Sequence, residues 1–294
     1  MITKIGKKAQ EMQFSWLFAL IIGAAILFLA VFFSGKLLET GTYQTEAEMA
    51  RSIDILLNPF ASIRQATITL SKPITLPEKT NMSFKCDEIN NLQKISILLE
   101  KGKKPFTYSI KNKYIFGSDF YAKDIWVFGK PFEMPWRIDD FIYVVSGNYC
   151  FVNAPNNIKA ELGTLNSSKI KIVNEKCTNA INVCFSGACD VPVTYNNGKG
   201  YVWTKEGNLE FIDDATMYGA VFGQDVYKCN LNRILKRMEI QASIMIGKSD
   251  LLGCSNIKSD LLGLKSSAAT KSYANIIDYA ERIKSENSIS CPIY

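Results

Sequence analysis

The sequence predicts an α+β protein with a single transmembrane helix near its N-terminus. Three observations support this prediction: an uncharged apolar run at residues 14–33, short alternating or β-branched segments between residues 66 and 211, and helical periodicity after residue 222. We therefore expect the following parts in chain order: a cytoplasmic tail at 1–13, the transmembrane helix at 14–33, a juxtamembrane helix or linker at 34–60, a mostly antiparallel β-rich extracytoplasmic domain at 61–222, and a disulfide-braced C-terminal helical hairpin at 223–294 packed on it.

The apolar run is the strongest single signal in the chain. Residues 14–33 carry no charge, and a helix of this length spans about 30 Å, the thickness of the hydrocarbon core of a bilayer. A cleaved signal peptide is the rival interpretation. The run is longer than the usual apolar core of such peptides, about 7–15 residues, and residues 30–34 make a poor cleavage site. We therefore predict a retained anchor in the lipid bilayer.

The charges beside the run predict its orientation. Lys4, Lys7 and Lys8 precede it, whereas Lys36 is the only cation in the stretch that directly follows. Cytoplasmic flanks carry an excess of Lys and Arg. The N-terminus is therefore expected in the cytoplasm and the bulk of the chain outside the cell membrane.

Cysteine usage also favours export. All eight cysteines follow the apolar run, and they are Cys86, Cys150, Cys177, Cys184, Cys189, Cys229, Cys254 and Cys291. An even number of cysteines fits disulfides in an oxidising compartment. A zinc site is less favoured because close cysteine pairs are scarce and the chain has no histidine, while free buried thiols remain an alternative.

The expected helical hairpin suggests one cysteine pair. Helical periodicity at 225–252 and 268–286, joined by a linker at 255–267, predicts two antiparallel helices. Cys229 begins the first and Cys291 follows the second, so we expect a Cys229–Cys291 disulfide. Cys184 with Cys189, or Cys177 with either of them, could close a small loop, and the other pairings stay open.

The middle of the chain is expected to form strands. Turn residues separate the predicted strands, and Asn197-Gly198 is a strong hairpin signal. The predicted strands are residues 66–70, 95–99, 106–110, 124–128, 141–145, 170–173, 191–194 and 200–203. A helix is also expected at about 45–57.

Two carboxylate pairs are candidates for chemistry. Asp139-Asp140 and Asp213-Asp214 could bind a cation or act as acid and base. Both pairs adjoin predicted strand ends, where Asp commonly fills turns and caps helices, so a structural role is favoured.

Three further sets of residues are candidates for contacts or modification. Ser15, Ala19 and Gly23 form a small-residue ridge on which another membrane helix could pack. Phe132 and Trp136, in the proline-bracketed string 130–137, could contact a partner, although such aromatics more often close a core. The sequons at Asn81 and Asn166 would be glycosylation acceptors after export.

Several classes of function lack support. Without histidine, Ser-His-Asp and Cys-His catalysis is excluded, and no phosphate-binding glycine loop is present. The net charge of +6 comes from scattered lysines, so nucleic acid is not an expected partner. No cofactor or metal is expected.

Two resemblances add to this interpretation. The junction Lys7-Lys8-Ala9-Gln10-Glu11 resembles the processing site of archaeal type IV pilin-like precursors, although Phe14 stands where many pilins have glutamate. The string KPFEMPWR at 130–137, with residues 124–127, 218–220 and Cys229, resembles uncharacterised archaeal single-pass surface proteins. That group implies the architecture and a cell-surface location but no activity.

These observations favour a non-catalytic, membrane-anchored surface protein with a structural, adhesive or assembly role, acting through a protein partner or self-association. The alternatives are a pilin-like filament subunit, an anchored envelope hydrolase that uses carboxylates, and an accessory subunit of a membrane complex.

Overall fold

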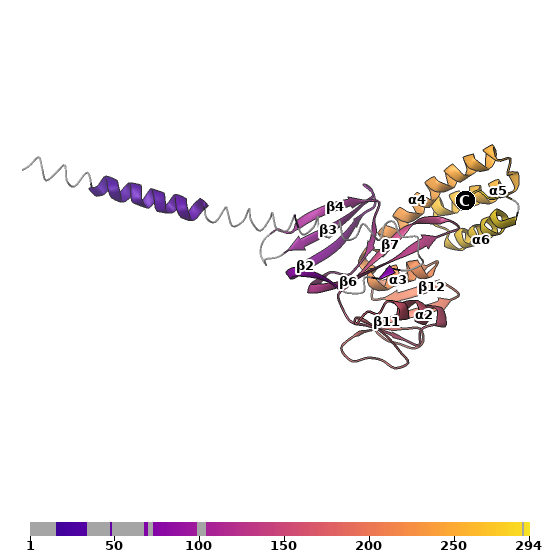
Figure 1. Cartoon of the computed structure of the whole chain (residues 1–294), viewed down its shortest axis with the longest axis horizontal. Coiled ribbons are helices and arrows are strands. Elements are labelled where there is room, and N and C mark those ends of the chain that lie inside the picture. Colours follow the sequence, from indigo (N-terminus) through magenta and orange to yellow (C-terminus); the bar gives the residue numbers. More distant parts are fainter. Residues whose placement is uncertain (1–15, 34–47, 49–67, 70–72, 99–103, 290) are drawn as a thin grey trace, which may run out of the picture. The chain divides into compact units, whose positions relative to one another are not determined.

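The computed structural model describes residues 16–33, 48, 68–69, 73–98, 104–289 and 291–294. The chain divides into two units, Met1–Met49 and Ala50–Tyr294. In the first unit, the helix Trp16–Phe33 has a mean hydropathy of 2.8 and buries none of its residues (Figure 1). It is therefore long and apolar enough to cross a membrane. Apart from Glu48, which is helical, the predicted juxtamembrane segment 34–60 lies outside the described residues, as does Ser15.

The second unit begins with a seven-stranded sheet in the order β4-β3-β2-β6-β7-β5, with β1 paired to β6. All its pairs are antiparallel except β5 with β7. The strands are β1 (Ile68–Thr69), β2 (Ile74–Asp87), β3 (Leu92–Leu98), β4 (Phe106–Lys111), β5 (Tyr114–Phe116), β6 (Phe120–Glu133) and β7 (Arg137–Val145).

A second, six-stranded sheet has the order β13-β12-β11-β10-β8-β9. Its strands are β8 (Tyr149–Val152), β9 (Ile170–Val173), β10 (Ile181–Cys184), β11 (Val191–Asn196), β12 (Lys199–Thr204) and β13 (Gly207–Phe211). Helix α2 (Asn156–Thr164) connects β8 to its parallel neighbour β9. The pairs β8–β10 and β10–β11 are also parallel, so this sheet is mixed, whereas β11, β12 and β13 form an antiparallel meander.

The predicted hairpin turn at Asn197-Gly198 is confirmed, with a loop of these two residues between β11 and β12. Their φ angles are 47° and 84°, as a type I′ turn requires. The turn residues and Lys199 line a cavity that the start of α3 also lines.

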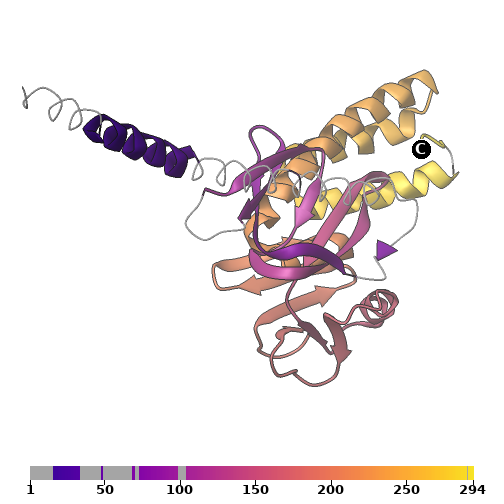
Figure 2. The same ribbon diagram turned by 60° about the vertical axis from the view of Figure 1, so that its left-hand side comes forward.

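Four helices complete the second unit: α3 (Asp214–Phe222), α4 (Gln224–Leu251), α5 (Ser255–Thr270) and α6 (Tyr273–Ile289). The α+β prediction with a helical C-terminus is confirmed, but the predicted hairpin contains three helices because residues 255–270 are not a linker. Ile257, Leu261, Leu264 and Ala268 are buried along one side of α5. Figures 1 and 2 both show α4 and α5 lying side by side.

The extra helix overturns the predicted Cys229–Cys291 disulfide. Three consecutive helices joined by short turns reverse direction twice, so the end of α6 returns toward the α4–α5 turn rather than the start of α4. Cys291 accordingly pairs with Cys254, and Cys229 pairs with Cys86 on β2. The predicted loop closure by Cys184 and Cys189 is confirmed, and Cys150 pairs with Cys177.

An aromatic core joins the two sheets through α3. Phe222 of α3 contacts Phe128 and Tyr143 of the first sheet and Phe151 of the second, with ring centroids 5.5–6.1 Å apart. Each buried ring removes a large apolar area from water, and such offset pairs add further stabilisation. This packing fixes α3, whose N-terminus forms one wall of the cavity described next.

Candidate functional site

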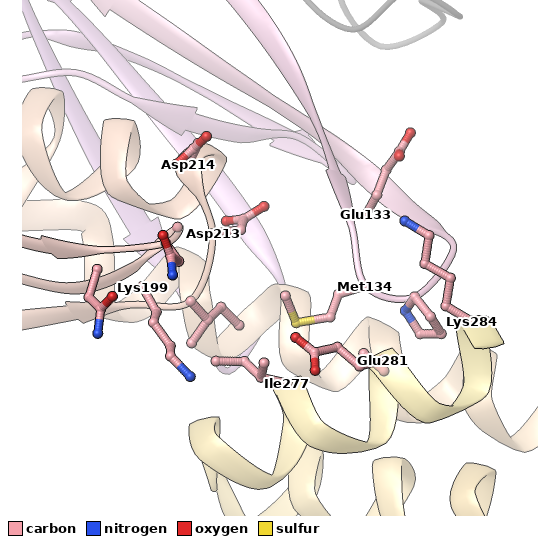
Figure 3. A pocket seen from close by; sticks show the side chains of 14 residues that line it. Glu133, Met134, Lys199, Asp213, Asp214, Ile277, Glu281 and Lys284 are labelled. Atoms are coloured by element: carbon pink, nitrogen blue, oxygen red, sulfur yellow. The ribbon is translucent and has the colours of Figure 1, made fainter. Parts of the chain in front are cut away.

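One pair of the predicted carboxylates lines a cavity of about 610 Å³. The β11–β12 turn, the start of α3, the β6–β7 connection and α6 form its walls (Figure 3). Its charged lining residues are Glu133, Lys199, Asp213, Asp214, Glu281 and Lys284.

Asp213 is the N-cap of α3. Its Oδ1 accepts a hydrogen bond from the backbone N–H of Thr216 at 2.7 Å, and its own backbone N–H donates to Thr216 Oγ1 at 3.0 Å, which completes a capping box. Desolvation raises the pKa of Asp213 to about 6, against the lowering effect of the Thr216 hydrogen bonds. The carboxyl group therefore titrates above its usual range while it holds the helix terminus.

Asp214 ties three elements together. The Tyr195 hydroxyl on β11 donates to its Oδ1 at 2.7 Å, and Asn157 Nδ2 on α2 donates to its Oδ2 at 3.0 Å. Burial, followed by the hydrogen bond to Asp214, raises the pKa of Tyr195 to about 12. Both oxygens of Asp214 are thus occupied by partners from the fold.

The other pair, Asp139 and Asp140 on β7, does not line this cavity. Arg137 holds Asp140 with contacts of 2.5 and 2.6 Å, and Arg237 of α4 lies 3.1 Å from Asp139 Oδ2. Burial raises the pKa of both aspartates. The structure therefore does not bring the two predicted pairs together, and the second pair forms ion pairs that join the β7 strand to itself and to α4.

This arrangement is better suited to stabilising the fold than to catalysis. A carboxylate that serves as a nucleophile or base needs an oxygen directed at a substrate. The hydrogen bonds from Thr216, Tyr195 and Asn157 instead direct Asp213 and Asp214 at their own backbone and neighbours. In the part of the chain that the structure describes, no group of three or more Cys, Asp or Glu side chains is arranged to hold a metal ion.

The predicted partner contacts Phe132 and Trp136 are wrong, because both side chains are buried. Phe132 stacks on Phe141 with ring centroids 5.2 Å apart, and Trp136 Nε1 donates to Gln241 Oε1 of α4 at 2.7 Å. The two residues close the core between β6, β7 and α4.

The remaining predicted residues lie on exposed surface. Ala19 and Gly23 are exposed on the N-terminal helix, and a Cβ added to Gly23 would meet no atom within 4 Å. Asn81 on β2 and Asn166 after α2 are both exposed. Association through the ridge and glycosylation stay predictions.

A second hollow, of about 470 Å³, has no counterpart in the sequence-based predictions. Tyr201 of β12, Glu210 of β13, Lys228 of α4 and Tyr273 of α6 are among its lining residues. The available signal was the alternation in β12, because Tyr201 and Trp203 are two residues apart and must share one face of the strand.

Comparison with protein-family models, with curated proteins and with solved structures found no match to this chain.

Proposed function

We propose that the protein is a membrane-anchored, extracytoplasmic binding protein without catalytic activity. The helix Trp16–Phe33 carries the proposal, because its residues are apolar and none of them is buried by the protein. Thirteen large hydrophobic side chains of this helix are exposed. Contact of these side chains with water would be energetically unfavourable, whereas a bilayer covers them. A single-pass anchor accounts for this helix without any further partner.

The disulfides support an extracytoplasmic location for the second unit. All eight cysteines are paired in four disulfides, and such bonds persist in oxidising compartments but are rare in the cytosol. The lysines before the helix favour a cytoplasmic N-terminus by the positive-inside rule. Both arguments lead to an anchor with its N-terminus inside and Ala50–Tyr294 outside.

A labelling experiment in intact cells tests this topology. We expect an impermeant maleimide to label Ser266→Cys, on the exposed side of α5, without permeabilisation, and to label Thr3→Cys only after it. Alkaline extraction should leave the chain in the membrane pellet. Reversed labelling would contradict the proposed orientation, and a mature chain that begins beyond residue 33 by intact mass would contradict the retained anchor. Intact mass also checks that the four disulfides survive each substitution.

The ridge of Ala19 and Gly23 supports a lateral partner within the membrane, such as other subunits of a complex or a filament. Small side chains let a second helix approach closely. Gly23→Leu should then reduce co-purification of partners from native membranes, whereas Ala25→Leu, on the opposite face, should not. Equal recovery of partners with both variants would show that the ridge is not a contact surface. Intact mass tests the filament version, which requires processing after Ala9.

A carboxylate-dependent envelope hydrolase is the second candidate. The observation in its favour is that Asp213 and Asp214 line one cavity together with Glu133 and Glu281. Release of soluble fragments from isolated cell envelopes by the wild-type protein, lost in Asp214→Asn but retained in Asp140→Asn, would establish it. If the folded wild-type protein releases no soluble fragments, the hydrolase candidate is excluded and the non-catalytic function remains.

A further inference from the structure

The outer face of the β11–β12–β13 meander combines aromatic and polar side chains. Register places Tyr201 directly across from Glu210, and Trp203 directly across from Asn208. Residues opposite one another in a sheet share a face. The alternate positions Val202 and Leu209 are buried, so the five-residue outer set of Thr194, Tyr201, Trp203, Asn208 and Glu210 points away from the core.

The Trp203 ring is held by a hydrogen bond, and both aromatic rings remain accessible. Trp203 is 47% exposed, and its Nε1 donates to Thr194 Oγ1 on the neighbouring strand at 3.1 Å. Tyr201 is 37% exposed, and its ring centroid lies 6.5 Å from that of Trp203. A hydrogen bond at the edge of the indole restrains the ring without covering its face. The binding of a ligand that stacks on these rings would therefore cost little side-chain conformational entropy.

The meander is also braced from below. Gly200, the residue before Tyr201, has φ +153°, and a Cβ there would lie 1.8 Å from the carbonyl oxygen of Thr194. The Tyr227 hydroxyl of α4 donates to the backbone oxygen of Glu210 at 2.5 Å. Close backbone approach on one side and a buried hydroxyl on the other fix the spacing of the aromatic and polar groups.

The hollow beside Tyr201 gathers polar groups that the fold does not use. Its lining includes Asn208, Glu210, Lys228 and Tyr273. Within the described residues, the side-chain polar atoms of these four and the Tyr201 hydroxyl take part in no hydrogen bond or ion pair. Burial raises the pKa of both Glu210 and Tyr273. The Tyr273 hydroxyl can donate a hydrogen bond, as any neutral tyrosine can. Donors and acceptors therefore converge on the space without partners.

We propose that this aromatic and polar surface, lined by Tyr201, Trp203, Asn208, Glu210 and Lys228, binds a neutral oligosaccharide. Sugar rings offer apolar C–H faces, which pack on aromatic rings, and hydroxyl edges, which exchange hydrogen bonds with carboxylates, amides and ammonium groups. Tyr201 beside Glu210 and Trp203 beside Asn208 supply this combination twice, which fits two successive sugar units.

The charges favour a neutral ligand. Glu210 and Lys228 carry opposite signs in the same hollow, so neither an anionic nor a cationic ligand gains a net attraction. The inference rests on the proposed function in that a domain outside the cell membrane meets envelope saccharides. The binding itself does not depend on location, so the two proposals fail separately.

Binding is tested with the full-length chain in phosphatidylcholine nanodiscs, because detergents with sugar headgroups would compete. The probe is an array of immobilised neutral hexasaccharides, including cellohexaose, chitohexaose and mannohexaose, with acidic glycans alongside. We expect at least one neutral glycan to bind, and Trp203→Ala and Tyr201→Ala to weaken it about tenfold or more, as expected for truncation of a central aromatic contact. Trp203→Phe should retain most binding.

Tyr121→Ala is the matched control, since Tyr121 is a tyrosine on β6 that is 63% exposed. It should bind as the wild type does, and all variants should melt within a few degrees of it. A blank array, equal binding by the Trp203→Ala and wild-type chains, or retention of acidic glycans alone that disappears at about 0.5 M salt would each overturn the proposal. If the array is blank but Ser266→Cys is labelled from outside the cell, the saccharide proposal fails and the proposed topology stands.

Discussion

Two hollows beside the second sheet, the carboxylate cavity lined by Asp213 and Asp214 and the hollow beside Tyr201, differ in what their polar side chains do. In the carboxylate cavity, Asp213 caps α3 and Asp214 binds Tyr195 and Asn157. In the hollow beside Tyr201, the side-chain polar atoms of Asn208, Glu210, Lys228 and Tyr273 form no hydrogen bond or ion pair among the described residues. Acidic side chains that are conspicuous in a sequence can thus be committed to the fold, while less conspicuous ones are left available to a ligand.

The largest expected effect concerns the α4 wall of the second hollow. Cys229 follows Lys228 and ties α4 to Cys86 of β2, which is 143 positions earlier in the sequence. Replacing both by serine should cost about 5 kcal/mol of unfolding free energy, because a long loop loses much entropy on closure. Replacing Cys184 and Cys189, which are 5 residues apart, should cost only about 2 kcal/mol. Urea denaturation in nanodiscs measures both, and equal losses would show that the long-range link does not hold α4.

The next effect concerns the stability contributed by two carboxylates that line the first cavity. Asp214→Ala removes the acceptor of the Tyr195 hydroxyl and one of the two acceptors of the Asn157 amide, so we expect a loss of about 2 kcal/mol. Glu281→Ala changes the same cavity at an exposed carboxylate with no hydrogen bond among the described residues, and it should change stability by less than about 0.5 kcal/mol. Losses of similar size in the two variants would contradict a structural role for Asp214.

Much of this fold follows from local patterns. The apolar run, the alternating strands and the Asn197-Gly198 turn are each specified by neighbouring residues. By contrast, β2 contains Pro77 and several charged residues, and β8 and β10 have only four residues each, so their pairing depends on the rest of the sheet. Helix α5 did carry a signal, the spacing of Ile257, Leu261, Leu264 and Ala268, but its serines and glycine resemble a linker. Because the sequence-based prediction lacked α5, it gave α6 the opposite direction and led to the wrong disulfide.

A smaller effect depends on pH. The pKa of Asp213 is raised from 3.8 to about 6 in the fold, so the protonated form is favoured there. The stability that this proton contributes is present below pH 4 and is lost as the pH rises toward 6. Asp213→Asn keeps an acceptor for Thr216 and carries no charge at any pH.

The melting temperature of Asp213→Asn relative to the wild type should therefore rise between pH 4 and pH 6 and level off above that range. A difference that does not change with pH would show that burial does not disfavour the carboxylate.

The smallest expected effect falls on the aromatic face. Tyr201→Ala removes a cross-strand contact with Glu210, and such pairs contribute about 0.2–1 kcal/mol. The exposed side of the meander should thus tolerate truncation, as a ligand surface does. A loss well above 1 kcal/mol in thermal or urea unfolding would mean that Tyr201 serves the fold instead.

The candidate sites were harder to predict than the fold, and the reason is physical. Phe132 and Trp136 attracted attention because prolines bracket them, yet burial depends on α4 covering the β6–β7 connection, with Gln241 accepting the indole N–H. Tyr201 and Trp203 lie in a predicted strand, but which of its faces remains open depends on distant helices. Local sequence specifies the alternation, and tertiary packing decides which side is exposed.

The most direct test measures saccharide binding and melting temperature together for Trp203→Ala and Asp214→Ala, in the full-length chain in nanodiscs. The account predicts that Trp203→Ala loses binding at an unchanged melting temperature, and that Asp214→Ala melts lower while it binds as the wild type does below its transition. Loss of binding in Asp214→Ala with normal binding in Trp203→Ala would contradict the account and make the carboxylate cavity the functional site.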